Sequence, residues 1–183
     1  MKNPYLIGDK LYLRPLDRED APIIQGFINN PGISRNLLAY RPFTLAMELA
    51  YIENSANSPT DLSLGICLKA DDQLIGTASL HAIHPKDRRA EFGMAIGDER
   101  QWGKGYGTEV TRLMAQLAFE RLNLNRLSLS VYDFNERGIR AYTRVGFQRE
   151  GVLREYTFVD GAYHDAIIMS LLRSDWEKAK LPA

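Results

Sequence analysis

Three glycines alternate with other residues in the segment Gln101-Trp102-Gly103-Lys104-Gly105-Tyr106-Gly107-Thr108. Glycine lets a backbone come close to a ligand and turn its N–H groups outward. The residues that follow predict an amphipathic helix, and a helix N-terminus carries about half a positive charge. A glycine turn joined to a helix N-terminus is typical of a phosphate or pyrophosphate site. The competing interpretation is a plain tight turn, which does not require three alternating glycines.

Two common phosphate motifs do not fit this segment. A nucleoside triphosphatase loop needs Gly-Lys followed by Ser or Thr, whereas Lys104 is followed by Gly105. A dinucleotide fingerprint needs a strand–helix–strand unit, whereas the chain before Gln101 predicts a hairpin. The segment therefore indicates a different phosphate-bearing ligand.

The loop must be positioned by the strands and helices that the hydrophobic periodicity predicts on either side of it. Strand patterns occupy residues 11–14, 62–68, 74–83, 90–96, 127–131, 147–158 and 163–172. Helix patterns run from the cap Asp17 to the turn at 29–32, over 44–57, from Gly103 onward and over 135–145, where Gly146 closes the helix. This order favours an α+β fold with a mixed, mostly antiparallel sheet of about six to seven strands and helices on both faces.

Length and composition limit the class of protein. With 183 residues, 45% hydrophobic and 25% charged, the chain is expected to form a single domain over residues 1–183. A net charge of zero disfavours a nucleic-acid protein with a broad basic face. No apolar run approaches a membrane span of roughly 18 residues, and the N-terminus has no apolar signal core. The single cysteine fits a reducing, cytoplasmic location.

Three segments together resemble the GNAT superfamily of N-acetyltransferases. Gly103-Lys104-Gly105-Tyr106-Gly107-Thr108 resembles the family's acetyl-CoA pyrophosphate loop, and residues 135–147 resemble its later motif of an Asn-capped helix with a tyrosine, followed by Gly-Phe. The opening Leu11-Tyr12-Leu13-Arg14-Pro15-Leu16 is similar to the Rim-type branch, which includes ribosomal-protein N-terminal and polyamine acetyltransferases. The resemblance covers residues 11–172 and implies a three-layer α/β/α fold.

The resemblance also implies which residues hold acetyl-CoA. In the family, the strand before the loop splays from its neighbour and its backbone pairs with the pantetheine arm, which maps onto Met94, Ala95 and Ile96. The loop maps onto residues 102–108. At Trp102, where the family often has Gln or Arg, we expect backbone rather than side-chain contacts. Asn135 lies where the family's capping residue sits near the cofactor, and no metal is implied.

Tyr142 and Glu91 are the candidate catalytic residues. In the family, the tyrosine on the later helix faces the thioester sulfur, and a phenol can donate its proton to a departing thiolate. The alternative for Tyr142 is a core aromatic, because Ile139, Tyr142 and Val145 share a helical spacing. Glu91 shares a strand face with Gly93 and Ala95 and is a candidate base. Its alternative is an ion pair with Arg88 or Arg89. The family places the oxyanion donor at the backbone N–H of Met94 or Ala95.

The remaining reactive residue types favour structural roles. His81 and His84 are three apart on a predicted strand, which makes them poor joint metal ligands, and His164 follows an exposed turn. Cys67 is expected to be a buried structural thiol. Arg137, Arg140 and Arg144 form a basic helix that faces either CoA phosphates or solvent.

The sequence thus predicts an acetyl-CoA-dependent N-acetyltransferase acting on a primary amine. The alternative is a CoA-binding regulatory or sensor module without turnover. Protein N-termini, polyamines, amino sugars and antibiotics all remain open as acceptors. Acidic residues on the first two predicted helices, Glu19, Asp20, Glu48 and Glu53, are suited to attracting a cationic amine. The oligomeric state is not determined by the sequence, and a homodimer is the working expectation.

Overall fold

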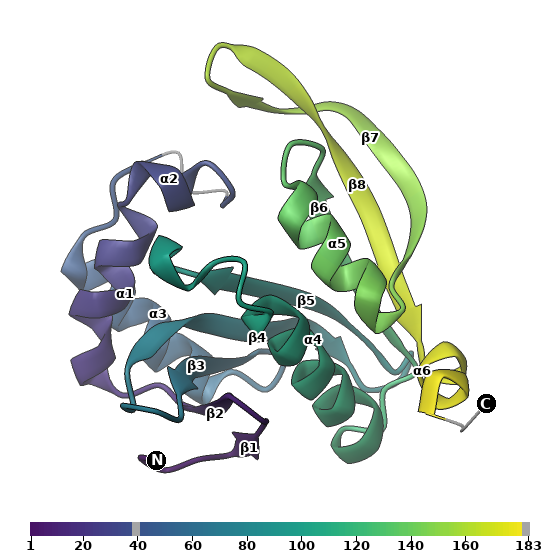
Figure 1. The fold of residues 1–183 in the computed structure, drawn as a ribbon, viewed down its shortest axis with the longest axis horizontal. Helices are drawn as coiled ribbons and strands as arrows, with labels where there is room; N and C mark the ends of the chain where they lie inside the picture. The colour runs from purple at the N-terminus through teal and green to yellow at the C-terminus, as the bar shows by residue number, and fades with distance from the viewer. Residues whose placement is uncertain (38–40, 181–183) are drawn as a thin grey trace.

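The computed structural model of the protein describes residues 1–37 and 41–180, and the strands in these residues form one sheet (Figure 1). Its order is β1-β2-β3-β4-β5-β6-β8-β7. The strands are β1 Leu6–Ile7, β2 Leu11–Pro15, β3 Leu62–Leu68, β4 Leu74–His84, β5 Arg89–Ile96, β6 Arg126–Tyr132, β7 Gln148–Val159 and β8 Ala162–Leu172. Neighbours are antiparallel except for β5 and β6, which run parallel. The predicted mixed, mostly antiparallel sheet is confirmed.

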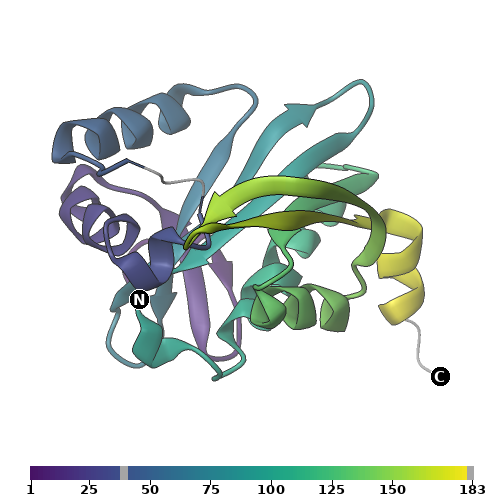
Figure 2. The same ribbon diagram turned by 90° about the horizontal axis from the view of Figure 1, so that it is seen from above.

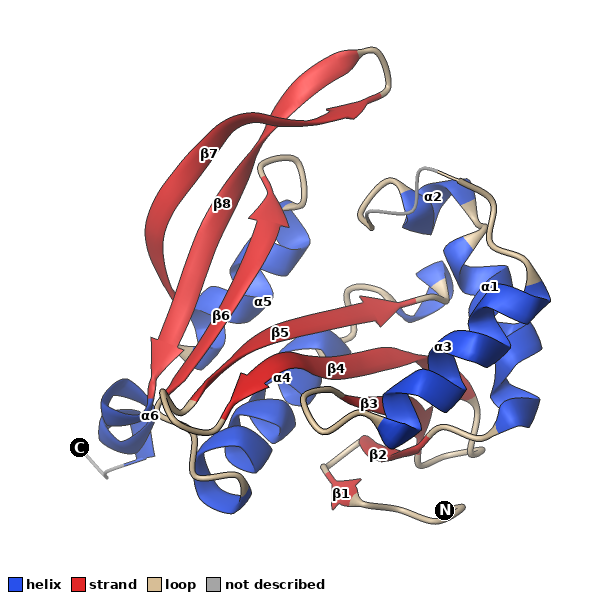
Figure 3. Ribbon diagram, turned by 180° about the vertical axis from the view of Figure 1, so that it is seen from behind, coloured by secondary structure: helices blue, strands red, loops and turns tan. Residues whose placement is uncertain are grey.

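Helices cover both faces of this sheet, which confirms the three-layer arrangement (Figure 3). They are α1 Ala21–Ile28, α2 Pro31–Ser34, α3 Leu45–Asn57, α4 Tyr106–Gln116, α5 Glu136–Val145 and α6 Arg173–Lys180. Short 3-10 turns span Arg18–Asp20 and Glu99–Gln101, and a π-helical turn over Leu117–Arg121 extends α4. Helices α1 and α3 lie on one face, and α4 and α5 lie on the other.

The two faces enclose separate cores. The larger one lies under α4 and α5 and contains Leu80, Phe92, Met114 and Leu127. The smaller one lies under α1 and α3 and contains Tyr12, Ala21, Ile24, Ile52, Cys67 and Leu74. Cys67 is fully buried there, as predicted for a structural thiol, and burial raises the pKa of its thiol.

The structure adds elements that the periodicity did not predict. Strand β1 has only two residues, too few to show an alternating pattern, and it makes the sheet eight-stranded rather than six- or seven-stranded. The predicted turn at residues 29–32 contains the start of α2, because the Asn30 side chain accepts a hydrogen bond from the Gly32 N–H. Helix α6 is anchored by Trp176, whose ring centroid lies 6.1 Å from that of Phe119.

A buried ion pair fixes the start of α1. Both terminal nitrogens of Arg14 donate to the carboxylate of Asp20 at 2.7 Å, and the Asp17 N–H donates to the same carboxylate at 2.8 Å. Burial opposes ionisation of Asp20, but these donors outweigh it and hold the pKa of Asp20 below its usual value. Because Asp20 is used in this way, α1 begins at Ala21 rather than directly after Asp17.

We predict that Asp20→Asn destabilises the protein by about 3–5 kcal/mol at pH 7, because it leaves the Arg14 guanidinium buried without its counter-ion. Urea unfolding measures the change. The Asp20 contribution is present above its unfolded pKa of about 3.9 and is lost as the pH falls through the lower folded value. Asp17→Asn is the control, because the Asp17 carboxylate is 45% exposed and lies 4.0 Å from Arg14, beyond hydrogen-bond distance. Equal stabilities of the Asp17 and Asp20 variants would contradict the assignment.

Candidate active site

Strands β5 and β6 separate soon after they meet, which opens the middle of the sheet (Figure 1). Their register contains only Arg89 with Arg126, Ala90 with Leu127 and Glu91 with Ser128. Strand β5 stays paired with β4 as far as Ile96. The β6-facing edge of residues 92–96 is therefore without a strand partner in the described chain. This is the splay that the resemblance implied for Met94, Ala95 and Ile96.

Aromatic rings pack at the narrow end of this opening. The Phe92 ring lies edge-on to the Tyr142 ring with centroids 6.1 Å apart, and the Phe147 centroid lies 5.9 Å from that of Tyr142. Phe92 comes from β5, Tyr142 from α5, and Phe147 follows the Gly146 cap of that helix. Helix α5 is thereby held against the point where the strands part.

The glycine loop lies where β5 leads into α4, and its glycines have different tasks. Gly103 and Gly105 have φ angles of +76° and +88°, and Gly105 is the N-cap of α4 without a side-chain cap. The first N–H groups of an uncapped helix need an outside acceptor. A Cβ on Gly107 would lie 3.2 Å from the Met94 Cε, so this glycine lets α4 approach β5 closely. The loop has the donors and the charge for a pyrophosphate.

Trp102 fastens this loop to the end of β5. Its indole N–H donates to the Ile96 carbonyl oxygen at 2.9 Å, so the side chain is committed to the protein, as expected from its departure from the family pattern. The Arg137 guanidinium carbon lies 3.5 Å from the Trp102 ring centroid. This stacking brings a cation from α5 to the loop. The Lys104 ammonium instead donates to the Gln101 side-chain oxygen at 2.9 Å.

Asn135 caps α5, and its side-chain oxygen accepts a hydrogen bond from the Gly138 N–H at 3.0 Å. A Cβ on Gly138 would lie 2.9 Å from the Asn135 side-chain nitrogen. The cap itself therefore explains the glycine inside this helix.

A cavity of about 770 Å³ extends from the opening toward α1 and α3. Its walls include Met94, Ala95, Ile96, Trp102, Gly103, Gly105, Tyr106, Gly107, Thr108, Asn135 and Tyr142. Nearly all of the predicted cofactor residues thus meet at one cavity. Lys104 and Glu91 do not line it.

Tyr142 belongs both to the core and to the cavity wall. Its side chain is 8% exposed, and none of the described residues hydrogen-bonds its hydroxyl. Burial raises the pKa of Tyr142 to about 12, so the phenol keeps its proton at neutral pH.

Glu91 lies at the last position of β5 that is paired with β6, and its side chain is exposed. No ion pair joins it to Arg88 or Arg89, since Arg88 binds Asn123 and Arg89 faces Asp87 at 3.6 Å in the described chain. Its cross-strand neighbours are His81 on β4 and Ser128 on β6. Glu91 thus lies next to the cavity-lining His81 but does not itself line the cavity.

Glu48 on α3 contributes an unpaired carboxylate to the cavity wall. The residue is 1% exposed, and neither carboxylate oxygen has a hydrogen-bond partner among the described residues. Burial raises the pKa of Glu48. One turn further along α3, the Tyr51 hydroxyl bonds to Ser63, which bonds to Ser79, each at 2.9 Å. Helix α3 therefore brings a carboxylate and a hydroxyl to the cavity wall, beside the apolar Ile24 and Ile28 of α1.

The hairpin of β7 and β8 extends toward α2 (Figure 2). Asp160 in its turn pairs with Arg35 at 3.1 Å, directly after α2, and Tyr156 of β7 lines the cavity. Segments from both ends of the chain thus enclose one space.

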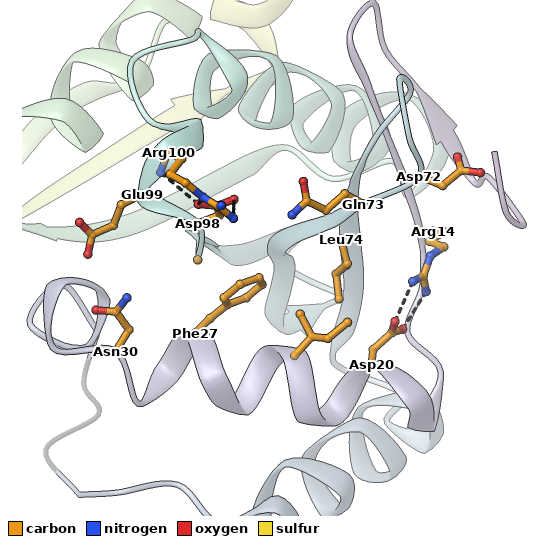
Figure 4. Close-up of a pocket in the computed structure, with 12 residues that line it drawn as sticks. Arg14, Asp20, Phe27, Asn30, Asp72, Gln73, Leu74, Asp98, Glu99 and Arg100 are labelled. Carbon is orange, nitrogen blue, oxygen red and sulfur yellow. Dashed lines mark hydrogen bonds and ion pairs between the residues drawn. The ribbon is translucent and has the colours of Figure 1, made fainter.

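A second hollow of about 780 Å³ lies between α1 and the end of β5 (Figure 4). Its buried or paired charged side chains are committed to one another, since Arg14 binds Asp20, Arg100 binds Asp98, and Asp72 binds the N-terminal amine. The remaining carboxylate, Glu99, is exposed. Among the described residues, no unpaired buried carboxylate and no loop with alternating glycines opens into this hollow, so the first cavity is the candidate active site.

Three residues at the active-site cavity were not among the predicted site residues. Glu48 was only one of several acids, Arg137 one of three basic residues on its helix, and His81 was assigned a structural role. Amphipathic spacing places Glu48 on α3, but its burial depends on α1 and the sheet. No group of three or more potential metal ligands occurs in residues 1–37 and 41–180. None of the described helices is long and apolar enough to cross a membrane.

Comparison with known proteins agrees with this geometry. Residues 10–148 match the model of the acetyltransferase (GNAT) domain. The chain is 32% identical over 164 residues to the spermidine N(1)-acetyltransferase of Escherichia coli K12, covering 90% of this chain and 87% of the relative. It is 31% identical over 173 residues to the N-acetyltransferase YoaA of Bacillus subtilis, covering 93% and 97%.

A solved structure extends the likeness to the whole fold. The spermidine N-acetyltransferase from Vibrio cholerae, in complex with CoA and spermine, has a TM-score of 0.84 and 27% sequence identity, covering 92% of this chain and 98% of the other. The glycine loop, the parted strands and these similarities agree. The chain belongs to the GNAT acetyltransferase family, whose acetyl donor is acetyl-CoA.

Proposed function

We propose that the protein transfers the acetyl group of acetyl-CoA to a primary amine of a small acceptor with more than one positive charge, such as a polyamine. The observation that carries this proposal is the cavity that joins the parted strands to the unpaired carboxylate of Glu48. The family supplies the donor, and the polyamine-acetylating relatives support the acceptor class.

The donor is proposed to lie along β5. Its pyrophosphate binds the N–H groups of residues 103–108 and the N-terminus of α4, with the Arg137 guanidinium nearby. The pantetheine arm pairs with the free backbone edge of Met94, Ala95 and Ile96, and Asn135 lies on the opposite wall. A backbone N–H at Met94 or Ala95 then faces the thioester oxygen and stabilises the developing oxyanion.

The reaction is proposed to be direct attack by the amine. The neutral amine forms a C–N bond with the thioester carbonyl carbon, and the C–S bond breaks as Tyr142 donates its proton to the departing thiolate. After the attack, Glu91 accepts through water the proton that the acceptor nitrogen loses, which its exposed place beside the opening permits. All the residues named in this mechanism belong to one chain, and none of them requires a partner subunit. The homodimer and the single domain over residues 1–183 stay predictions.

Glu48 supports a cationic acceptor. A buried carboxylate without a partner is costly, and an ammonium group would supply the missing counter-charge. A protein N-terminus carries a single ammonium that must also react, whereas a polyamine brings a second one. Release of free CoA in a screen of polyamines, amino sugars, antibiotics and peptides tests this choice. Binding of acetyl-CoA without CoA release for any acceptor would favour the regulatory module instead.

We predict that Gly105→Ala weakens acetyl-CoA binding by about tenfold, with the fold retained. A Cβ meets nothing at this position, but a φ of +88° is unfavourable for alanine by roughly 1–2 kcal/mol, so the loop relaxes away from its binding shape. Gly161→Ala is the matched control, because Gly161 has a φ of +84°, equally open space and a place in the β7–β8 turn. Calorimetry showing the same affinity in both variants would refute the loop assignment.

We predict that Tyr142→Phe lowers the rate of acetyl transfer about 100-fold while acetyl-CoA affinity stays the same. Loss of a general acid lowers the reaction rate by about 10²–10⁴-fold. We expect the smaller effect, because a thiolate can leave without being protonated. Turnover at saturating substrate measures this effect, with Tyr12→Phe as the control for losing a buried hydroxyl elsewhere. Near-normal turnover with rate-limiting chemistry would leave Tyr142 as a core aromatic.

The same variant has a stability signature at alkaline pH. The unfolded phenol ionises near pH 10, whereas the folded pKa of Tyr142 is about 12. The wild type therefore loses stability as the pH rises from about 10 to about 12, by about 3 kcal/mol at most, and Tyr142→Phe lacks this loss.

We predict that Glu48→Gln raises KM for spermidine about tenfold but leaves KM for a monoamine of similar length nearly unchanged. Glutamine keeps the shape and removes the charge. Because burial raises the pKa of Glu48, its ionisation costs stability as the pH rises above about 4.3. Glu48→Gln should then melt roughly 2–4 °C higher at pH 7 and not at pH 4.

Glu53→Gln is the control for Glu48, because Glu53 lies on the same helix but is exposed and paired with Arg18. If Glu48→Gln melts lower than the wild type and binds spermidine equally well, Glu48 has a structural role only.

A further inference from the structure

His81 lies on the cavity wall at an irregular point of β4. His81 pairs with Glu91 of β5, and the next registered pair is His84 with Arg89, so two residues of β4 oppose the single Ala90. Ala82 in this bulge has a φ of +47°, which is unfavourable for a non-glycine residue. Bulges redirect neighbouring side chains and are frequent beside active sites. The strain sits directly after a histidine that faces the cavity.

Asp61, just before β3, fixes the ring of His81. The His81 Nδ1 lies 3.1 Å from one carboxylate oxygen of Asp61, and the Ala82 N–H donates to the same oxygen at 3.4 Å. The hydroxyl groups of Ser58 and Thr60 donate to the other oxygen at 2.7 and 3.1 Å. These donors hold the pKa of Asp61 below its usual value, the Ser58 hydroxyl most strongly, so the carboxylate is ionised at neutral pH.

The pairing with Asp61 determines which ring nitrogen is free. An ionised carboxylate only accepts hydrogen bonds, so Nδ1 of His81 carries the proton and Nε2 of the neutral ring has the lone pair. A Cβ built on Gly93 would lie 4.0 Å from this Nε2. Gly93 is on β5 beyond the last residue paired with β6, where the opening begins. The basic nitrogen therefore lies over the strand that borders the opening.

Pairing with an aspartate does not by itself distinguish His81. The other two histidines of the chain have the same type of partner, His84 with Asp87 at 3.3 Å and His164 with Asp133 at 3.0 Å. Of the three, His81 lines the cavity and the other two do not. Location together with a fixed free nitrogen distinguishes this pair.

We propose that His81 takes the proton of the acceptor ammonium directly at Nε2, with Asp61 as its positioning residue; this step rests on the proposed acetyl transfer. The N–H bond of the ammonium breaks and an Nε2–H bond forms. The neutral amine then attacks the thioester carbon, and its nitrogen loses a second proton, which Glu91 accepts through water. The His81 imidazolium and the Glu91 carboxyl return these two protons to solvent, and Tyr142 regains from solvent the proton that it gave to the sulfur. Coenzyme A leaves with the proton given to its sulfur, so charge and protons balance.

The groups around His81 fit this role. Asp61 beside β3 contributes a negative charge that stabilises the imidazolium. Glu91 of β5 is its direct cross-strand neighbour, where side chains of one face lie about 5 Å apart at their Cβ atoms. Glu48 and Tyr51 of α3 line the same cavity. Glu91 thereby supports the charged ring from outside the cavity, while His81 contacts the acceptor.

The pH dependence of kcat/KM for spermidine tests the proposal, using His81→Gln, whose amide has no basic nitrogen. Without a base, only the neutral fraction of the amine reacts, which is on the order of 10⁻³ at pH 7.5 for an amine with a pKa near 10.4. We expect a loss of about 100-fold at pH 7.5 that shrinks about tenfold for each pH unit. Asp61→Asn should lose about tenfold, and imidazole should restore part of the activity of His81→Ala.

His84→Gln removes an aspartate-paired histidine from the same strand outside the cavity and should keep the wild-type profile. A His81→Gln profile that parallels the wild type in an enzyme that acetylates spermidine would overturn the proposal, whatever its melting temperature. If none of the amines tested makes the wild type release CoA, the proposed function itself fails. If the His81 variants lose activity equally at all pH values and imidazole does not restore it, the Asp61–His81 pair has only a structural role, joining the start of β3 to β4.

Discussion

The early parting of β5 from β6 is the constraint on which the rest of the site depends. Backbone N–H and C=O groups need hydrogen-bond partners. After Glu91, strand β5 is paired with β4 on one side and, within the described chain, with no strand on its other side. An extended ligand can supply the missing strand on the other side. The opening is sustained by the aromatic contacts of Phe92, Tyr142 and Phe147, so the core packing and the binding edge have the same origin.

The charges of the molecule divide along this opening. At the loop end, an uncapped helix N-terminus and the Arg137 guanidinium offer positive potential to an anionic donor. At the α3 end lie the Glu48 carboxylate and the Asp61–His81 pair, which we propose to bind and deprotonate a cationic acceptor. In the proposed reaction, the two substrates reach the reacting centre from oppositely charged sides, although the net charge of the chain is zero.

Most elements could be predicted because their determinants are local. The glycines at positive φ, the Asn135 cap, the Gly146 helix end and the apolar stripe of α4 each act within a few residues. Trp102 shows the limit of this reasoning. Its departure from the family pattern was visible, but its bonds to Ile96 and Arg137 join three separate segments.

The sequence by itself determined the glycine turn before α4, the order of strands and helices, and the place of the tyrosine on α5, since these depend on spacing along a single segment. The tertiary structure decided which polar groups lack a partner and which histidine faces the cavity. The Asp61–His81 pair requires β3 and β4 in register with a bulge, and the isolation of Glu48 requires α1, α3 and the sheet together. Burial and cross-strand proximity are properties of packed elements, and a linear pattern contains neither.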